Sequence, residues 1–216
     1  MLKMLDLFSG LGGASEAMIR SEKWEVLRIE NNPLLSGVEN TEMIDVIEFR
    51  DTLASMIDEG FLPEPVDLLW ASPPCVEFSL AYSAPQSVAH RNNEEYQPNM
   101  DLLIATLDII DMIEPRYYVI ENVRGAKKWF APHLGEQRQV INHSIFLWGN
   151  YPAFVPGKIE SKYAHDGSSK DPLRPNKRAL IPYTVSDELR KAVEQQTTIF
   201  QWLGIMGEPP IYPGHQ

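Results

Sequence analysis

Short apolar runs alternate with helical patterns along this chain, and that alternation most restricts the folds open to it. Residues 2–8 predict a buried strand, the glycine-rich residues 9–13 a turn, and residues 14–20 a helix. Further strands are expected at residues 24–29, 45–47, 66–71, 116–120 and 145–148. Strands that alternate with helices build open sheets of mostly parallel strands, covered by helices on both faces. We therefore predict an α/β fold with a doubly wound sheet.

A length of 216 residues suits one well-buried domain. Residues 1–150 contain the strand pattern, whereas residues 151–182 are rich in proline, glycine, serine and charge and predict a loop-rich insertion. Helical spacing returns at residues 186–196, with Ser186 as the expected N-cap. We expect the helix and tail in residues 183–216 to complete the same domain.

The chain is acidic, with a formal net charge of -11. This charge argues against a protein whose whole surface binds nucleic acid, because phosphate contacts need lysine and arginine. Basic residues are nevertheless concentrated at 124–138 and at 158–178, and the second stretch contains six basic and three acidic residues. Two interpretations stay open: a basic face on an acidic body, or charged loops in water.

Several classes of protein are disfavoured by simple patterns. Apolar runs fall short of the roughly 18 to 20 residues of a membrane helix, and the start of the chain lacks a signal-peptide pattern. We expect no membrane partner and a cytoplasmic location, in a bacterial, archaeal or phage-infected cell. The single cysteine, Cys75, excludes an internal disulfide and a multi-cysteine metal site, and we expect no metal.

Cys75 follows Pro73 and Pro74 directly after the strand expected at residues 66–71. A lone cysteine is most often a small buried apolar residue. Here the prolines hold it rigidly where strand ends face the ligand crevice of such sheets, which favours a nucleophile. A thiol nucleophile needs a partner that handles protons, and Glu121 ends the neighbouring strand. The alternative for Glu121 is an ordinary loop acid.

Three features at the ends of successive strands suit a nucleoside cofactor. Gly10 and Gly12 let a ligand approach the backbone, although a lone glycine turn is weak evidence. Glu30 is placed to accept hydrogen bonds from two ribose hydroxyls, and Asp45 from an exocyclic amine. Each acid alone is more often an ordinary surface residue, but the three features together predict a cofactor site.

Three motifs in this order resemble the DNA cytosine C5 methyltransferase family. DLFSGLGG at residues 6–13 is similar to its cofactor motif, SPPCVEFS at 72–79 to its catalytic loop, and ENV at 121–123 to its Glu-Asn-Val motif. The resemblance covers residues 1–125, with fragments beyond. It implies a Rossmann-like, S-adenosylmethionine-dependent methyltransferase domain in residues 1–150, and a small target-recognition region in residues 151–182.

The resemblance also implies a mechanism and a set of contacts. Cys75 would add to C6 of a cytosine flipped out of duplex DNA, while Glu121 would protonate or hydrogen-bond N3. The methyl group would come from S-adenosylmethionine and leave S-adenosylhomocysteine. The implied cofactor contacts are Phe8, Gly10, Gly12, Glu30, Asp45, Val46, Pro74 and Leu102. A helical segment between residues 79 and 100 falls where the family has a mobile active-site loop.

The chain departs from the family pattern at several positions. Members usually carry Gln-x-Arg-x-Arg before a strand, with arginine reaching the base O2, but Asn142 and Ser144 stand where the arginines are expected. Val76 replaces a frequent glutamine, and the C-terminal Gly-Asn motif is not recognisable. With so few residues for reading DNA, we expect short or relaxed sequence specificity. Such compact members resemble those of phages and mobile elements, some of which belong to restriction-modification systems.

Two other functions remain in competition with DNA methylation. A methyltransferase that acts on RNA or a free nucleotide would suit the acidic charge and the small recognition region. A catalytically silent nucleic-acid-binding module would keep the fold without turnover, but the presence of both Cys75 and Glu121 argues against it.

Overall fold

A single sheet organises the chain in the computed structural model, which describes residues 1–159 and 171–202, with side chains through residue 196. The strand order is β3-β2-β1-β4-β5-β7-β6. The neighbouring strands from β3 to β5 pair in parallel. Strand β7 is antiparallel to both of its neighbours, β5 and β6. The strands are β1 Leu2–Leu7, β2 Trp24–Glu30, β3 Thr41–Met43, β4 Leu68–Ala71, β5 Tyr117–Asn122, β6 Gln139–Ile141 and β7 Ile145–Asn150. The predicted doubly wound, mostly parallel α/β fold is confirmed.

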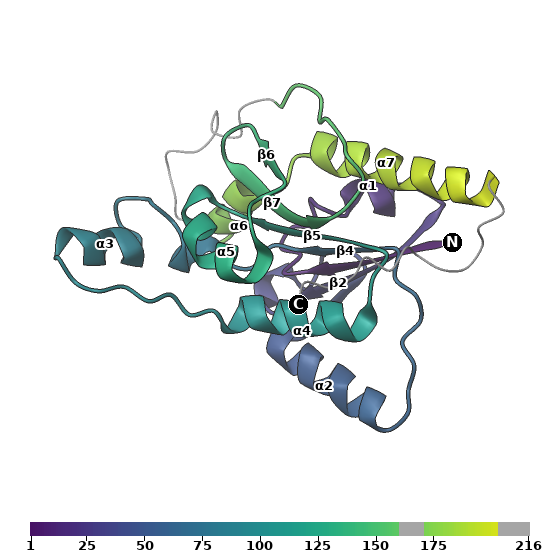
Figure 1. Cartoon of the computed structure of the whole chain (residues 1–216), viewed down its shortest axis with the longest axis horizontal. Helices are drawn as coiled ribbons and strands as arrows, with labels where there is room; N and C mark the ends of the chain where they lie inside the picture. Colours follow the sequence, from purple (N-terminus) through teal and green to yellow (C-terminus); the bar gives the residue numbers. More distant parts are fainter. Residues whose placement is uncertain (160–170, 203–216) are drawn as a thin grey trace.

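Helices cover both faces of the sheet, with α1 and α7 on one side and α2 and α4 on the other (Figure 1). The helices are α1 Glu16–Ile19, α2 Val46–Asp58, α3 Pro85–Arg91, α4 Asp101–Ile113, α5 Lys127–Leu134, α6 Arg174–Ala179 and α7 Tyr183–Trp202. Short 3-10 helices lie at Pro33–Leu35, Cys75–Glu77 and Arg124–Ala126. None of the helices within residues 1–159 and 171–202 combines the length and the apolarity needed to cross a bilayer.

The two faces of the sheet have separate apolar cores because successive strand residues point to opposite sides. In β4, Leu68 and Trp70 belong to the core that also holds Val185 of α7. Leu69 and Ala71 belong to the core beneath α2 and α4. All four β4 residues are fully buried. This burial on both faces explains why the strand is a continuous apolar run rather than an alternating one.

The prediction of an edge strand at residues 45–47 is wrong. The edge strand is β3, and Asp45 is the N-cap of α2, where its Oδ1 accepts the backbone N–H of Ile47 at 2.8 Å. Val46 and Ile47 suggested a strand because β-branched residues favour one. The capping bond of Asp45 and the packing of Val46 and Leu53 into the core favour the helix instead.

Ser186 is not the N-cap of the last helix, because α7 already begins at Tyr183. The Ser186 hydroxyl is buried and accepts the backbone N–H of Ala17 in α1 at 3.0 Å. Leu189 and Val193 are also buried against the α1 side of the sheet. The C-terminal helix therefore packs onto the N-terminal strand-turn-helix unit.

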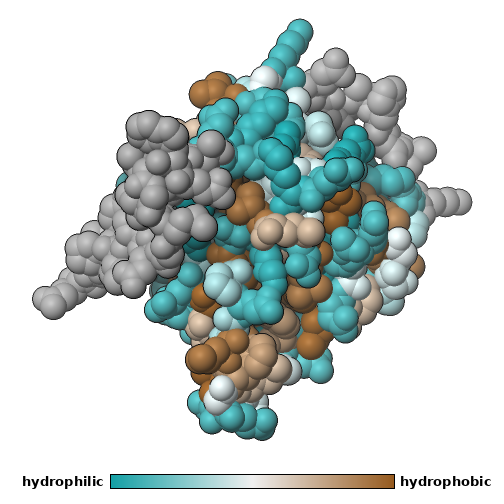
Figure 2. Space-filling model, turned by 90° about the vertical axis from the view of Figure 1, so that its right-hand side faces the viewer, coloured by the Kyte–Doolittle hydropathy of each residue, from teal (hydrophilic) through white to brown (hydrophobic). Residues whose placement is uncertain are grey.

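The predicted loop-rich stretch, 151–182, has no helix or strand in residues 151–159 and contains α6. Residues 160–170 of this stretch, and residues 203–216 of the expected tail, lie outside the described residues. Figure 2 views the molecule from the side of the N-terminus, where apolar residues are interspersed with polar ones. The strand ends that concern function lie at the opposite end, near α3, α5 and α6 (Figure 1).

Candidate active site

The turn after β1 holds three residues in the left-handed region: Phe8 at φ 58°, Gly10 at φ 55° and Gly12 at φ 76°. A Cβ on Gly12 would lie 2.4 Å from the guanidinium carbon of Arg28, so Gly12 is required by close packing inside the protein. A Cβ on Gly10 would meet no atom nearer than Asn176 Nδ2 at 3.9 Å. Gly10 is therefore the glycine of this turn that leaves room for a ligand.

Glu30 ends β2 and ties the glycine turn to the loop that follows its own strand. Its Oε2 accepts the backbone N–H of Gly10 at 2.8 Å, and its Oε1 accepts those of Asn31 and Asn32 at 3.0 and 2.9 Å. Oε1 thus accepts two hydrogen bonds, whereas Oε2 accepts one and keeps a further lone pair. Glu30 thus shapes the crevice between β1 and β2, and its contact with a ribose stays a prediction.

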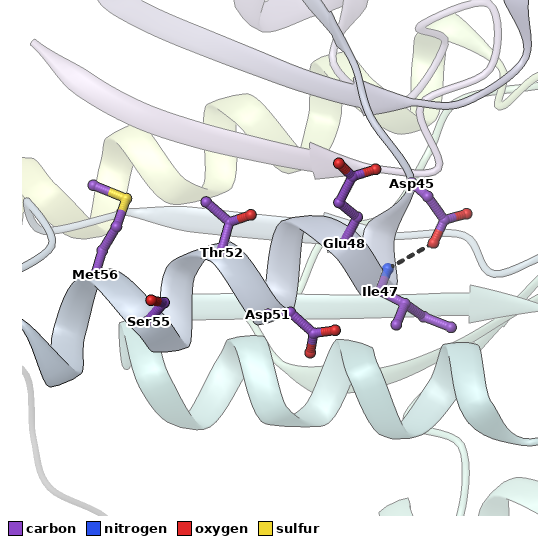
Figure 3. Close-up of a pocket in the computed structure, with 7 residues that line it drawn as sticks. All are labelled: Asp45, Ile47, Glu48, Asp51, Thr52, Ser55 and Met56. Atoms are coloured by element: carbon purple, nitrogen blue, oxygen red, sulfur yellow. Dashed lines mark hydrogen bonds between the residues drawn. The ribbon is translucent and has the colours of Figure 1, made fainter.

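Asp45 stands at one end of an open hollow of about 700 Å³ along α2 (Figure 3). Besides capping α2, Asp45 accepts the side-chain amide of Asn31 at 2.7 Å. Glu48 and Asp51 also line the hollow, so its charge is negative and disfavours phosphate. The side chain of Val46 is buried in the core, so only its backbone is left to meet a ligand.

A second cavity of about 240 Å³ lies between the catalytic loop and the start of α4. Pro74 and Leu102, two of the predicted cofactor contacts, line it together with Ile47 from the first turn of α2. Ile47 borders both hollows. Because ligand pockets usually measure about 300 to 1,000 Å³, this cavity suits one flat part of a ligand, such as a purine.

Cys75 begins the 3-10 helix that follows β4, and the residue is exposed. Protein atoms surround the thiol closely enough that desolvation raises its pKa, and the negative charge of Glu121 raises it further. The positive charge of Arg178 acts in the opposite direction. The two predicted catalytic residues, Cys75 and Glu121, are therefore close enough to interact, as parallel neighbouring strands required.

Asn122 connects the end of β5 to the catalytic loop. Its side-chain amide donates to the carbonyl oxygen of Pro73 at 2.9 Å, and its own oxygen accepts the backbone N–H of Val123 at 2.9 Å. The residue is 1% exposed. Below it, a Cβ on Gly125 would lie 1.9 Å from the carbonyl oxygen of Phe78, so the two loops are in direct backbone contact. Asn122 was not among the predicted site residues, although it lies in the ENV motif.

We expect Asn122→Ala to destabilise the protein by about 1–3 kcal/mol, because it leaves the buried Pro73 carbonyl without its donor. It should also lower the rate of methyl transfer more than cofactor affinity, since Cys75 lies two residues from that carbonyl. Urea unfolding and steady-state kinetics measure the two effects. Asn92→Ala, at an exposed asparagine, is the control for stability. An unchanged unfolding free energy would refute the stated role of the Asn122 amide.

A buried charge network supports the glycine turn from beneath. The Ser15 hydroxyl donates to Asp6 Oδ2 at 2.5 Å and accepts from Arg28 Nε at 2.8 Å, while Arg28 Nη2 donates to the Gly12 carbonyl at 3.0 Å. Asp6 and Arg28 are almost completely buried. Desolvation raises the pKa of Asp6 to about 6, although Ser15 and Arg28 act to lower it.

This pKa makes the stability of the protein depend on pH. A carboxyl group with a raised folded pKa binds protons more tightly in the folded state, so its contribution is largest at low pH and falls as pH rises through 6. The full titration costs about 3 kcal/mol, and about 1 kcal/mol of it falls between pH 5 and 7.5. Asp6→Asn lacks this titration, so its unfolding free energy relative to that of wild type should rise by about 1 kcal/mol between pH 5 and 7.5. Urea unfolding at several pH values measures this difference. A pH-independent difference between the two proteins would contradict the raised pKa.

Asn142 and Ser144, which stand where the family pattern has arginines, lie in the tight turn between β6 and β7. Asn142 and His143 both have positive φ, at 49° and 56°, and the N–H of Ser144 donates to the Ile141 carbonyl at 3.2 Å. Positive φ at both central positions is the requirement of a type I′ turn, and asparagine tolerates it well. Asn142 is therefore suited to the backbone of this tight turn.

Part of the predicted basic surface is engaged in contacts within the protein. Lys127 lies 3.9 Å from Glu136, Lys177 pairs with Asp171 at 2.6 Å, and the Arg138 guanidinium lies over the ring of Tyr151. Lys162 and Lys170 lie outside the described residues. Three of the basic residues in these two stretches are therefore engaged within the protein.

The sequence of the chain matches a model of the C-5 cytosine-specific DNA methylase family over residues 2–144, which is most of its length. The chain belongs to this family. The matched residues contain the glycine turn, Cys75 and Glu121, and end within the β6–β7 turn. The methylase therefore has the family's strand-end motifs on the family's type of α/β sheet, and methylation of cytosine C5 in DNA is the general reaction of its family.

This methylase is similar to a protein of nearly its own length and to others that are much longer. It is 24% identical over 214 residues to a Frog virus 3 protein named "Probable DNA (cytosine-5)-methyltransferase", covering 90% of this chain and 92% of that one. It is 26% identical to the type II methyltransferase M1.HphI of Haemophilus parahaemolyticus, covering 67% of this chain but 37% of that one. A prophage-encoded E. coli protein described as a DNA modification methyltransferase is 23% identical, with a TM-score of 0.40, over 61% of this chain and 35% of that one.

Proposed function

We propose that this methylase transfers a methyl group from S-adenosylmethionine to C5 of cytosine in DNA through a covalent bond between Cys75 and C6. The observation that supports it best is that Glu121 lies close enough for its charge to act on the Cys75 thiol. The Asn122–Pro73 hydrogen bond joins the two segments that contain these residues. Residues 1–150 would form the catalytic domain, residues 151–182 a reduced recognition region, and residues 183–216 the end of the same domain.

Cys75 supplies the nucleophile in this proposal. Cytosine C5 is a weak nucleophile until a group adds to the neighbouring C6. The thiol loses its proton to solvent, the sulfur forms a bond to C6, and the C5–C6 double-bond electrons become available at C5. Because burial and Glu121 raise the pKa of the thiol, the deprotonated form is scarce at neutral pH and the rate should rise with pH.

Glu121 acts on the opposite side of the ring. Its carboxyl group donates a proton or a hydrogen bond to N3, so that the electrons pushed in by sulfur leave an enamine rather than an isolated carbanion. After C5 has gained its methyl group, a base removes the C5 proton, the thiolate leaves C6 and N3 returns its proton to Glu121. Both residues are regenerated by these steps.

The residues around the glycine turn fit S-adenosylmethionine, which when bound supplies an electrophilic methyl group. Gly10 has open space in front of it, and the cavity at Pro74 and Leu102 suits a purine ring. Glu30 would accept from the ribose hydroxyls, and Asp45 and the Val46 backbone would meet the adenine. Phe8 and Gly12 complete the proposed contact set, Gly12 by holding the turn against Arg28.

A target cytosine within duplex DNA is stacked and paired, so neither C6 nor N3 is open to Cys75 and Glu121. We therefore propose that duplex substrate is bound with its target base flipped out. The helix α3, which projects beside the catalytic loop, follows the cysteine in sequence and lies where the resemblance expects a mobile loop (Figure 1).

The acceptor is tested by labelled methyl transfer to four substrates: duplex DNA, single-stranded DNA, RNA and free dCTP. The proposal predicts transfer to DNA, with label at C5 of cytosine after digestion to nucleosides. The net charge of -11 gives a non-DNA acceptor some support. Transfer to RNA or dCTP alone would establish that alternative. Cofactor binding without transfer to any of the four would instead establish a silent module.

A further inference from the structure

Residues 80–100 form a segment between the catalytic loop and α4, which contains α3 and projects from the body of the protein (Figure 1). Most residues of this projecting segment are exposed, and its buried side chains are those of Ala84, Ala89 and Pro98. Such small side chains bury little apolar area. The position of the projecting segment therefore depends on polar and aromatic contacts with its neighbours.

Tyr96 ties the projecting segment to the 3-10 helix that begins with Cys75. Its hydroxyl group donates to Glu77, with Oε2 at 2.7 Å and the carbonyl oxygen at 2.8 Å. The backbone N–H of Asn99 also donates to Glu77 Oε2, at 3.4 Å. Glu77 is the last residue of the 3-10 helix, whose turn is closed by the Phe78 N–H donating to the Cys75 carbonyl at 3.0 Å. The Tyr96 hydroxyl therefore holds the turn that contains the thiol.

Trp129 of α5 supports this contact from the body of the protein. Its indole N–H donates to Gln86 Oε1 in α3 at 2.9 Å, and its ring meets that of Tyr96 edge to face, with centroids 6.2 Å apart. Aromatic pairs prefer this arrangement. Helix α5 follows the end of β5, where Glu121 lies. One set of contacts therefore joins the projecting segment, the 3-10 helix of Cys75 and the chain that follows β5.

We propose that Tyr96 is a positioning residue for Cys75, which holds the 3-10 helix through Glu77 and couples its placement to that of the projecting segment. This inference rests on the proposed function only for the use of Cys75 as a nucleophile. The Asn122 amide already holds the other end of the catalytic loop through the Pro73 carbonyl. Tyr96 supplies the second hold, and displacement of the projecting segment would remove it.

Trypsin provides a test of the hold on the projecting segment. Arg91, at the end of α3, is the only lysine or arginine between Arg50 and Arg116, so cleavage after Arg91 gives a defined pair of products. We expect Tyr96→Phe, which keeps the ring and removes the hydroxyl group, to speed this cleavage about fivefold in the full chain. The reason is that local opening becomes easier when one hydrogen bond to a carboxylate is lost.

Two further measurements test the link to the nucleophile. Cys75 is the only cysteine, so iodoacetamide alkylation followed by intact mass reports on this thiol alone. Without DNA or cofactor, Tyr96→Phe should be alkylated about threefold faster at pH 7, because a loosened helix leaves the thiol less desolvated. In methyl transfer, kcat should fall about tenfold while the affinity for S-adenosylmethionine stays within about twofold, as expected for a misplaced nucleophile.

Tyr82→Phe is the matched control, because it removes a hydroxyl group from the same segment. Tyr82 is 79% exposed, and its contacts within the described residues use its ring and its carbonyl oxygen. Unchanged cleavage or unchanged alkylation in Tyr96→Phe, or equal changes in Tyr82→Phe, would overturn the proposal. Slower methyl transfer with unchanged alkylation would also overturn it, since Tyr96 would then act on the substrate rather than through the 3-10 helix.

Circular dichroism identifies any variant that unfolds. Glu77→Ala removes the carboxylate that accepts from Tyr96, so it should show the same faster cleavage and alkylation, and it keeps the test decisive if Tyr96→Phe unfolds. Wild-type rates in a folded Glu77→Ala would contradict the proposal. Cleavage and alkylation need no turnover, so failure here is distinct from failure of the proposed methyl transfer.

Discussion

Cys75→Ala is expected to abolish methyl transfer, with a loss of about a thousandfold or more, while cofactor binding and folding persist. Without a sulfur to add at C6, C5 of cytosine stays too weak a nucleophile to accept the methyl group. Because Cys75 is exposed, its truncation should change the unfolding free energy by less than about 0.5 kcal/mol. Labelled transfer to cytosine-containing DNA and thermal unfolding measure the two quantities.

The matched variant is Cys75→Ser, which keeps the shape of the side chain and removes its acidity. A hydroxyl ionises far less readily than a thiol, so this variant should be nearly as inactive as Cys75→Ala. Cofactor affinity, measured by calorimetry, should be unchanged in both. Retention of more than a tenth of wild-type transfer in either variant would contradict the covalent mechanism.

Glu121→Gln is expected to slow methyl transfer about 10²- to 10⁴-fold, because an amide cannot give N3 a proton. The same change should make Cys75 easier to alkylate. Glu121 raises the pKa of the thiol, so removing its charge lowers that pKa and increases the thiolate present at neutral pH. The variant should therefore lose turnover while its thiol becomes more reactive toward iodoacetamide.

These opposite effects separate a chemical role for Glu121 from a structural one. If Glu121 only maintained the loop, both turnover and alkylation would change through misplacement of Cys75, with no fixed relation to charge. Glu77→Gln is the control, because Glu77 lies in the 3-10 helix that contains Cys75 and accepts the Tyr96 hydroxyl. Slower alkylation in Glu121→Gln than in wild type would contradict the predicted charge interaction.

The strand ends of the site were predictable because sheet geometry brings distant residues together. Cys75 and Glu121 follow β4 and β5, which are parallel neighbours, so their carboxyl ends had to meet. Glu30 was also placed correctly at the end of β2, but its bonds to Gly10 and the following amides were not predictable from spacing. The strand that ends at Glu30 can be predicted from its own apolar residues, whereas the hydrogen bonds of the Glu30 carboxylate depend on how the glycine turn folds.

The parts that sequence reasoning missed depend on contacts between distant segments. Asp45 caps a helix rather than belonging to a strand, and Ser186 bonds to Ala17 across 169 residues. Arg178 lies in a stretch predicted to be loop-rich and basic, and that pattern did not predict that its helix, α6, lies beside the glycine turn. Local periodicity contains no information about such pairs.

The measurement that tests the central claim most directly is covalent trapping on duplex DNA containing 5-fluorocytosine, with S-adenosylmethionine present. Fluorine at C5 cannot leave as a proton does, so the enzyme should remain bonded to C6 after methylation. The account predicts an adduct on denaturing gels whose intact mass equals protein plus methylated DNA, and which is absent in Cys75→Ala. No adduct across a range of DNA sequences, from protein that binds the cofactor, would contradict it.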